Sequence, residues 1–245
     1  TRDTLRHKAA AKRLLLENPW TRVGARYALP EDEWYVRRYN IKAKPPQQAQ
    51  LQVPPQPYIG NPATARVILL GKNPGYSPVD DDDLARVSEL ETENMRALTF
   101  ESEYPFFSLD PRFEGTNCYK HWNDALADLL AACQNDHGVD RDTVISRLAV
   151  IQWHPYHSQR SFDFKDLEEP LLSQAYNLEL VREAIRANRL FVLQYGAGNE
   201  KQWRGKLPEL PKDCITTNSP QSPLLSRGNL SPDNFERLVA TLCAP

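Results

Sequence analysis

Four short stretches of the sequence combine amide, hydroxyl and aromatic side chains with prolines, and a binding site could be built from these residue types. The stretches are 71–76 (GKNPGY), 153–158 (WHPYHS), 195–199 (YGAGN) and 218–227 (NSPQSPLLSR). An amide such as that of Asn73 can hydrogen-bond a water molecule but cannot take its proton near neutral pH. Chemistry at these stretches would therefore depend on positioning rather than on general-base catalysis.

Metal, thiol and dinucleotide chemistry find little support in the sequence. His154 and His157 lack the helical H-x-x-x-H spacing and have no cysteine or carboxylate pair near them, so we expect no metal site and consider both as pocket or phosphate contacts. The G-x-G of 195–199 predicts a close strand-to-helix turn, with an anion bound at the helix N-terminus as the alternative. The four cysteines form no C-x-x-C pair, which predicts reduced thiols in a cytoplasmic protein. The acidic run 80–83 precedes a predicted helix, where carboxylates favour the positive end of the dipole.

The elements that position these residues follow from the hydrophobic pattern after residue 57, where short β-branched runs alternate with longer amphipathic runs. The pattern predicts an α/β fold in three layers, with a short parallel sheet of about four strands flanked by helices on both faces. In such a sheet ligands bind beyond the carboxyl ends of the strands, and each polar stretch directly follows a predicted strand, so we expect the four stretches to share one edge. Strands are expected at 66–70, 147–152, 190–194 and 214–217, and helices at about 82–98, 116–134, 171–187, 197–204 and 231–243.

The composition indicates one globular domain with an unusual N-terminal segment. Of the 245 residues, 40% are hydrophobic and 25% charged, which excludes a disordered chain, and no apolar run approaches the ~18 residues of a membrane span. Five of the 20 prolines lie in 45–57, which favours extended backbone. We expect residues 1–57 to form a helix at 3–17 and a Pro-rich strap, both packed on a domain formed by 58–245. No secretory signal is visible at the charged N-terminus.

Two of the polar stretches resemble the motifs of the uracil-DNA glycosylase superfamily. Gly71-Lys72-Asn73-Pro74-Gly75, after RVILL, is similar to the first motif in the G-x-N-P-G form of the mismatch-specific uracil/thymine branch. The stretch 218–227, which a terminal helix follows, is similar to the second motif with a short insertion. Phe106 and Phe107 lie between them, where the family carries an aromatic that stacks on the extruded base. The resemblance covers roughly 58–243 and implies the fold of that superfamily, with this chain as a divergent member.

The resemblance implies a hydrolase that flips a uracil or damaged base out of DNA and cleaves its N-glycosidic bond. Asn73 would then orient the attacking water, and Asn218 would hydrogen-bond the departing base. The resemblance further implies a base pocket, in which Phe107, with Phe106 as the alternate, stacks on the base and the Gln152 amide reads its edge. The base-binding residues would be Gly71, Lys72, Pro74, Gly75, Tyr76, Phe106, Phe107, Gln152 and His154.

The second motif would hold the DNA itself. Its serines can donate to phosphates, and a leucine could push into the stack where the base leaves. Arg227 could enter the minor groove or hold a phosphate. The DNA-binding residues would be Ser219, Ser222, Leu224, Leu225, Ser226 and Arg227.

Each of these roles has a structural alternative. Asn73 could form only a local turn with the following Pro-Gly, both phenylalanines could be core residues, and Asn218 could cap loop backbone. Because neighbouring residues point opposite ways in an extended segment, we expect one phenylalanine at the base and the other in the core. The Ser/Pro stretch could be an ordinary surface turn.

The expected partner is DNA, single- or double-stranded, bound by a cytoplasmic monomer that uses no cofactor and contacts no membrane. A net charge of −2 argues against coating nucleic acid by bulk charge and leaves open a local basic groove. A different hypothesis is a non-catalytic nucleic-acid or base-binding protein of the same fold. Hydrolysis of a small nucleoside or nucleotide is a third, and it would need no leucine wedge.

Overall fold

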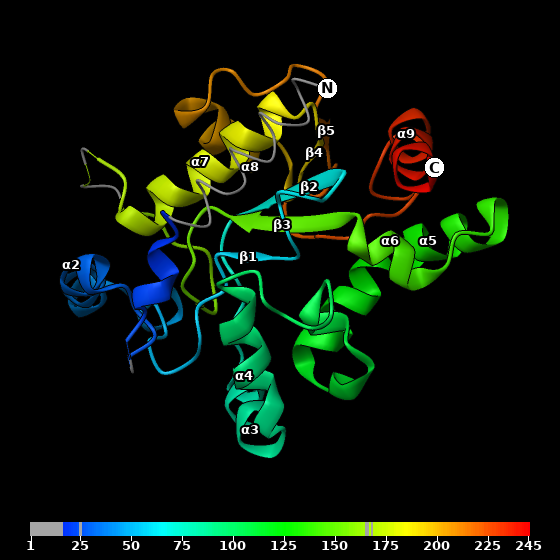
Figure 1. Ribbon diagram of the computed structural model, residues 1–245. Helices are drawn as coiled ribbons and strands as arrows, with labels where there is room; N and C mark the ends of the chain where they lie inside the picture. The colour runs from blue at the N-terminus through cyan, green and yellow to red at the C-terminus, as the bar shows by residue number, and fades with distance from the viewer. Residues whose placement is uncertain (1–16, 25, 165–166, 168) are drawn as a thin grey trace.

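The computed structural model describes residues 17–24, 26–164, 167 and 169–245, and a five-stranded mixed sheet lies at its centre (Figure 1). The sheet has the order β1-β3-β2-β4-β5, and its last four strands in that order are parallel. These four are the predicted strands: β2 (Val67–Gly71), β3 (Leu148–Gln152), β4 (Leu190–Leu193) and β5 (Ile215–Thr216). The α/β prediction is therefore confirmed. The helix predicted at 3–17 lies outside the described residues, apart from its last position.

The prediction of a purely parallel sheet is wrong at one edge. There β1 (Tyr58–Ile59) pairs antiparallel with β3. The strand has only two residues and follows a proline, so it leaves no alternating pattern in the sequence. Gly60 ends it with a φ of +78°, and a Cβ at this position would lie 2.5 Å from the carbonyl oxygen of Leu148. Glycine is therefore required where the chain turns from β1 toward β2.

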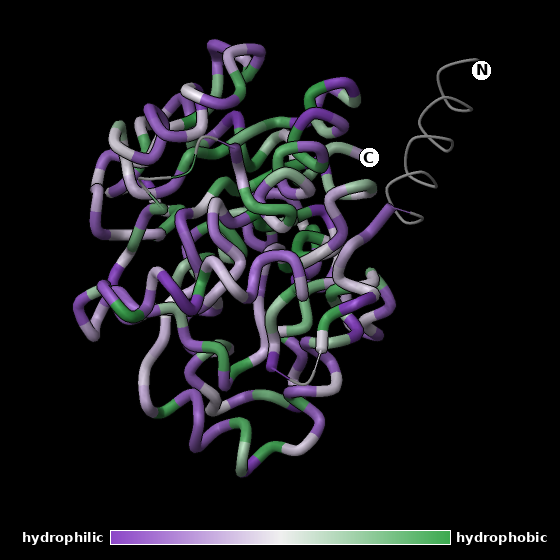
Figure 2. Tube along the Cα trace, turned by 90° about the vertical axis from the view of Figure 1, so that its left-hand side faces the viewer, coloured by the Kyte–Doolittle hydropathy of each residue, from purple (hydrophilic) through white to green (hydrophobic). Residues whose placement is uncertain are grey.

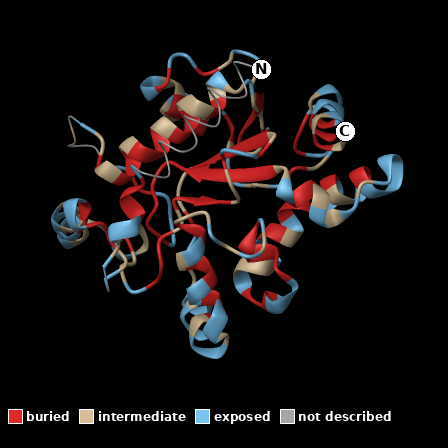
Figure 3. Ribbon diagram, viewed as in Figure 1, coloured by how far each residue is buried: buried red, intermediate tan, exposed pale blue. Residues whose placement is uncertain are grey.

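Helices cover both faces of the sheet, because successive side chains of the buried strands point to opposite cores. Ile68 and Leu70 of β2 face a core shared with α2 (Pro30–Lys42), α7 (Leu172–Arg186) and α8 (Gly196–Lys206). Val67 and Leu69 face the core of α4 (Ser88–Ala97), α5 (Asn117–His137), α6 (Arg141–Ser146) and α9 (Pro232–Cys243). In Figure 3 the buried strands lie between helices whose outer faces are exposed. Apolar stretches likewise gather around the centre of the trace in Figure 2.

The helix predicted at 82–98 is two helices. The first, α3 (Pro78–Arg86), begins with a capping box between Ser77 and Asp80. The helix ends with its cap at Val87, and α4 begins at the next residue. The helix α2 was not predicted, because its exposed face carries Trp34 and Ile41 and its apolar periodicity is weak. Four short 3-10 helices complete the described elements: η1 (Pro19–Arg22), η2 (Pro45–Gln47), η3 (Phe107–Leu109) and η4 (Pro111–Phe113).

The Pro-rich strap, residues 45–57, is ordered against the loop that follows β3. After η2 it turns at residues 51–52, and the backbone N–H groups of Gln50 and Gln56 donate to the carbonyls of His157 and Pro155, both at 2.8 Å. Earlier in the chain, Trp20 and Val36 are buried in the same core as the sheet. Within the described residues, no helix combines the length and the apolar character that crossing a bilayer requires.

Candidate functional site

A cavity of about 740 Å³ opens at the carboxyl edge of the parallel strands. All four polar loops contribute to its wall, with residues 72–77 after β2, 157–161 after β3, Tyr195 after β4, and Pro220 and Gln221 after β5. The prediction that these loops share one edge is confirmed. The chain passes from β2 to β3 on one side and then crosses to β4 on the other side, so Lys72 and Tyr195 flank the switch point where open α/β sheets bind ligands.

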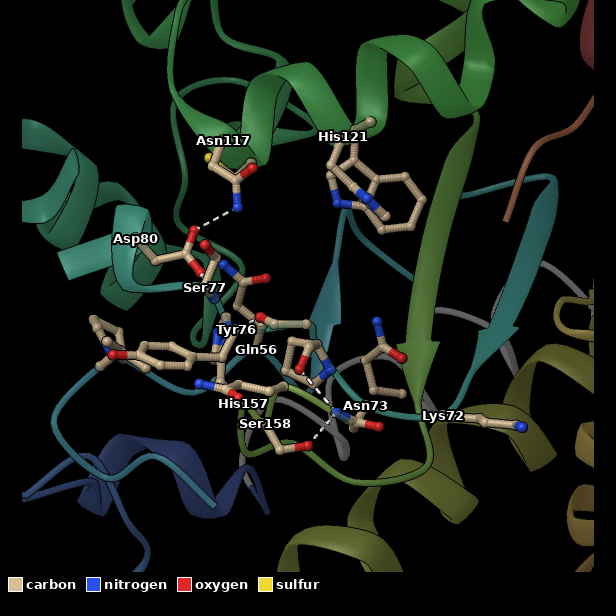
Figure 4. Close-up of a pocket in the computed structure, with 18 of the residues that line it drawn as sticks. Gln56, Lys72, Asn73, Tyr76, Ser77, Asp80, Asn117, His121, His157 and Ser158 are labelled. Atoms are coloured by element: carbon tan, nitrogen blue, oxygen red, sulfur yellow. Dashed lines mark hydrogen bonds between the residues drawn. The ribbon is translucent and has the colours of Figure 1, made fainter. Parts of the chain in front are cut away.

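Asn73 is held in one orientation at this cavity. Its Nδ2 donates to the carbonyl oxygen of Pro74 and to Oγ of Ser158, both at 2.9 Å (Figure 4). Both Nδ2 hydrogens are thereby used, and Oδ1 has no hydrogen-bond partner among the described residues. The local-turn alternative and a positioning role are thus compatible. An aspartate here would direct a carboxylate oxygen at the Pro74 carbonyl, so this site is built for an amide.

Gln152 is another amide of the cavity and lies at the end of β3. Its side chain is 6% exposed, and its Oε1 has no hydrogen-bond partner within the described residues. A buried acceptor without a partner costs about 1–3 kcal/mol. Gly71 was predicted to contact the base, but it does not line the cavity. It makes room for this amide, because a Cβ at position 71 would lie 2.2 Å from Gln152 Oε1.

Both phenylalanines are fully buried in the core, as the structural alternative held. Phe107 reaches the cavity wall from η3. Phe106 does not, so its assignment as a base contact is wrong. Its ring packs edge-on against Trp122 at a centroid distance of 5.3 Å, in the core below α5. Tyr76 lines the cavity as predicted, and its hydroxyl donates to Asp81 at 2.6 Å.

The acidic wall of the cavity has a structural role. Asp80 accepts from the backbone N–H of Ser77 at 2.6 Å, which confirms its expected place at a helix N-terminus. Its other oxygen accepts from Nδ2 of Asn117 at 2.8 Å (Figure 4). Asp83 accepts from the backbone N–H of Asn117 at 2.6 Å and from Arg86 at 2.7 Å. Protein donors therefore satisfy both carboxylates, which fix α3 to the start of α5.

The two histidines have separate surroundings. His157 lines the cavity, and its Nδ1 lies 2.6 Å from the carbonyl oxygen of Gly75. His154 does not line the cavity, so its assignment to the base pocket is wrong. Its ring stacks on Phe162 at 4.6 Å and its Nε2 lies 3.4 Å from Asp163, on the α7 side of the sheet. Burial lowers the pKa of both imidazoles, so both rings are neutral at neutral pH.

The second-motif loop, residues 218–227, differs most from its predicted role in binding the base and the DNA. Asn218 is exposed and lies outside the cavity wall, where its backbone N–H donates to Asn229. Leu225 cannot act as a wedge, because its side chain is fully buried in the core beneath α5 and its N–H donates to Ala125. Leu224, at 39% exposure, is the exposed leucine of the pair.

The remaining residues of this loop hold the loop together. Oγ of Ser219 and Oγ of Ser222 accept from N–H groups two residues on, and the carbonyl of Ser226 accepts from Asn229 and Leu230. Arg227 lies 3.4 Å from Glu236 and 3.7 Å from Asp136, and its guanidinium covers the ring of Phe235 at 4.4 Å. The surface-turn alternative therefore describes these contacts.

Sequence reasoning did not find the walls that the strap and α5 contribute. The strap places Val53, Pro54 and Gln56 on the cavity, and their types gave no signal. Asn117 and His121 of α5 also line it (Figure 4). These two polar residues are four positions apart, so they lie on the same face of the helix. That spacing could have indicated a polar helix face at the cavity.

The comparisons with known proteins return no relative, since no family model, curated protein or solved structure matches the chain.

Proposed function

We propose that the cavity binds a nucleobase of DNA and that the protein hydrolyses the N-glycosidic bond of that base. The observation that carries the proposal is the placement of the Asn73 amide. It is anchored through Nδ2 with Oδ1 unused, and it lines the same cavity as Phe107 and Gln152. These are a water-orienting group, an aromatic ring and an amide that pairs with a base edge. The motifs that resemble the uracil-DNA glycosylase superfamily support the same reaction.

In this proposal the bound base lies against the cavity wall at Phe107, and the side-chain amide of Gln152 pairs with the base edge. Oδ1 of Asn73 accepts from a water and directs its oxygen at the sugar carbon as the bond to the base breaks. The sugar develops oxocarbenium character and the base leaves with the electron pair of the bond. The water oxygen forms the new bond, and its proton passes to solvent or to the departing base.

The rate is expected to be modest for a physical reason. Asn73 cannot take the proton of the water, and Asn218 lies outside the cavity wall, so it does not stabilise the departing anion. The position of Asn218 also favours a second candidate function, in which the same cavity binds a base without cleaving it.

Oligonucleotides that contain uracil, alone in single strands or opposite guanine in duplexes, test the proposal when alkali then cleaves any abasic product. We expect abasic product with the wild type, a loss of at least tenfold in Asn73→Ala, and no change in Asn135→Ala, a matched amide that is exposed on α5. Binding that depends on Asn73 without any product across a panel of damaged bases would favour the second candidate. No product and no binding would overturn both.

A further inference from the structure

The charged residues of the cavity are not equally available to a ligand. The carboxylates of Asp80 and Asp83 are each engaged by two protein donors. The cations Lys72 and Arg160 also line the cavity, and neither has an ion pair or a side-chain hydrogen bond among the described residues. The charged side chains of the cavity that are free to contact a ligand are therefore these two cations.

These cations come from two different loops around Asn73. Lys72 precedes Asn73 and extends away from Asp80 and Asn117 (Figure 4), with Nζ 5.9 Å from the centre of the Tyr195 ring. Arg160 is exposed, and its backbone N–H donates to Pro46 of the strap at 2.7 Å. The chain reaches Arg160 two residues after Ser158, which anchors the Asn73 amide. A ligand whose base lies at Asn73 would thus meet cations on two walls.

We propose that the cavity takes its base from an unpaired nucleic-acid strand, whose phosphates Lys72 and Arg160 hold. This inference rests on the proposed base-binding function and specifies its substrate. A nucleotide within a strand carries a phosphate on each side of its sugar, which matches two unpaired cations better than a neutral nucleoside does.

The side chains of the second-motif loop favour an unpaired strand over a duplex as the ligand. Extraction of a base from a duplex needs a side chain that fills the stack and cations that hold the flanking backbone. Leu225 is in the core and Leu224 is exposed, but Arg227, the one cation of residues 218–227, is engaged by Asp136, Glu236 and the Phe235 ring, so the loop offers no free cation to a flanking phosphate. A strand that is already unstacked requires neither device.

The salt dependence of binding tests the two contacts. The probe is a labelled single strand containing 2′-fluoro-deoxyuridine, because the fluorine disfavours the oxocarbenium-like sugar and binding is measured without cleavage. Each phosphate contact on a single strand contributes a slope of about −0.7 to log K against log salt concentration. We expect Lys72→Met and Arg160→Gln each to reduce the slope by about that amount, and the exposed control Lys212→Met to leave it unchanged.

Three further arms decide the class of ligand. We expect the single strand to bind at least tenfold more tightly than a duplex of the same sequence, a nucleoside 5′-monophosphate to compete weakly, and inorganic phosphate not to compete. A duplex that binds as well, a monophosphate that competes as well as the strand, or unchanged slopes in both variants would overturn the inference. Cleavage with salt-insensitive binding would overturn this inference alone, whereas salt-dependent binding without cleavage would leave it standing and overturn hydrolysis. Thermal unfolding of each variant confirms that it is folded.

Discussion

Nδ2 of Asn73 lies 2.9 Å from Oγ of Ser158, and this hydrogen bond connects the loop after β2 with the loop after β3. Ser158 Oγ in turn donates to the carbonyl of Arg160 at 2.7 Å, so the serine cannot rotate away without losing its own acceptor. The orientation of the Asn73 amide therefore depends on a residue 85 positions later in the chain.

Substitution of Ser158 tests this positioning. Ser158→Ala removes one anchor of the amide, worth about 1 kcal/mol, which corresponds to roughly a fivefold loss in rate. We expect kcat for uracil release to fall about fivefold with little change in KM, because the amide still contacts the water but is less well oriented. Ser161→Ala is the matched control, since Ser161 also lines the cavity and has no bond to Asn73. A rise in KM with unchanged kcat would contradict the positioning role.

The site also requires a residue without a side chain at position 71. A Cβ there would lie 2.2 Å from Gln152 Oε1 and 2.9 Å from its Cδ, so Gly71→Ala must displace the amide. Overpacking of this kind costs about 1–3 kcal/mol, and in a chain of this size it lowers Tm by roughly 2–12 °C. We expect both this loss, measured by calorimetry, and weaker base binding.

A double substitution separates the clash from other effects. With Gln152→Ala present, Gly71→Ala meets no amide, so its additional effect on Tm should be small. Gly75→Ala is the comparison, because nothing lies within 4 Å of a Cβ at that position. If Gly71→Ala lowers Tm equally with and without the Gln152 amide, the clash is not the cause.

The sequence predicted the strand-end loops better than the contacts made within them. The runs RVILL and RLAVIQ are buried on both faces, so their apolar character alone identified β2 and β3 and placed Asn73 and Gln152 at one edge. The sequence predicted neither the role of Gly71, which depends on a side chain from another strand, nor the cavity wall formed by the strap, which depends on backbone hydrogen bonds to β3 and the loop after it.

The assignments that were wrong share a physical origin. Leu224 and Leu225 are identical in type, and only packing against α5 buries one of them. His154 and His157 follow the same strand, yet one contacts Phe162 and the other Gly75. A pattern of residue types identifies a loop, whereas the direction of each side chain within an irregular loop is set by tertiary contacts.

The two leucines of the second-motif loop should respond in opposite ways. Leu225→Ala removes a fully buried side chain and is expected to cost about 2–5 kcal/mol, whereas Leu224→Ala should change stability by less than about 0.5 kcal/mol. Urea unfolding of both variants measures the difference. Equal and small effects would show that Leu225 is not part of the core, and would restore it as a candidate wedge.

His157 should make the stability of the protein depend on pH near neutrality. Burial lowers the pKa of its imidazole, so the folded state keeps the ring neutral while the unfolded chain takes up a proton below about pH 6.5. The unfolded state then binds more protons, and the free energy of unfolding falls as the pH falls, by at most about 1.4 kcal/mol per pH unit for one ring.

Urea unfolding between pH 7.5 and 5 should give a flatter profile for His157→Gln than for the wild type. His154 contributes a loss of the same sign in both proteins, so it does not affect the comparison. Parallel profiles for the two proteins would mean that His157 is not buried as a neutral ring beside Gly75.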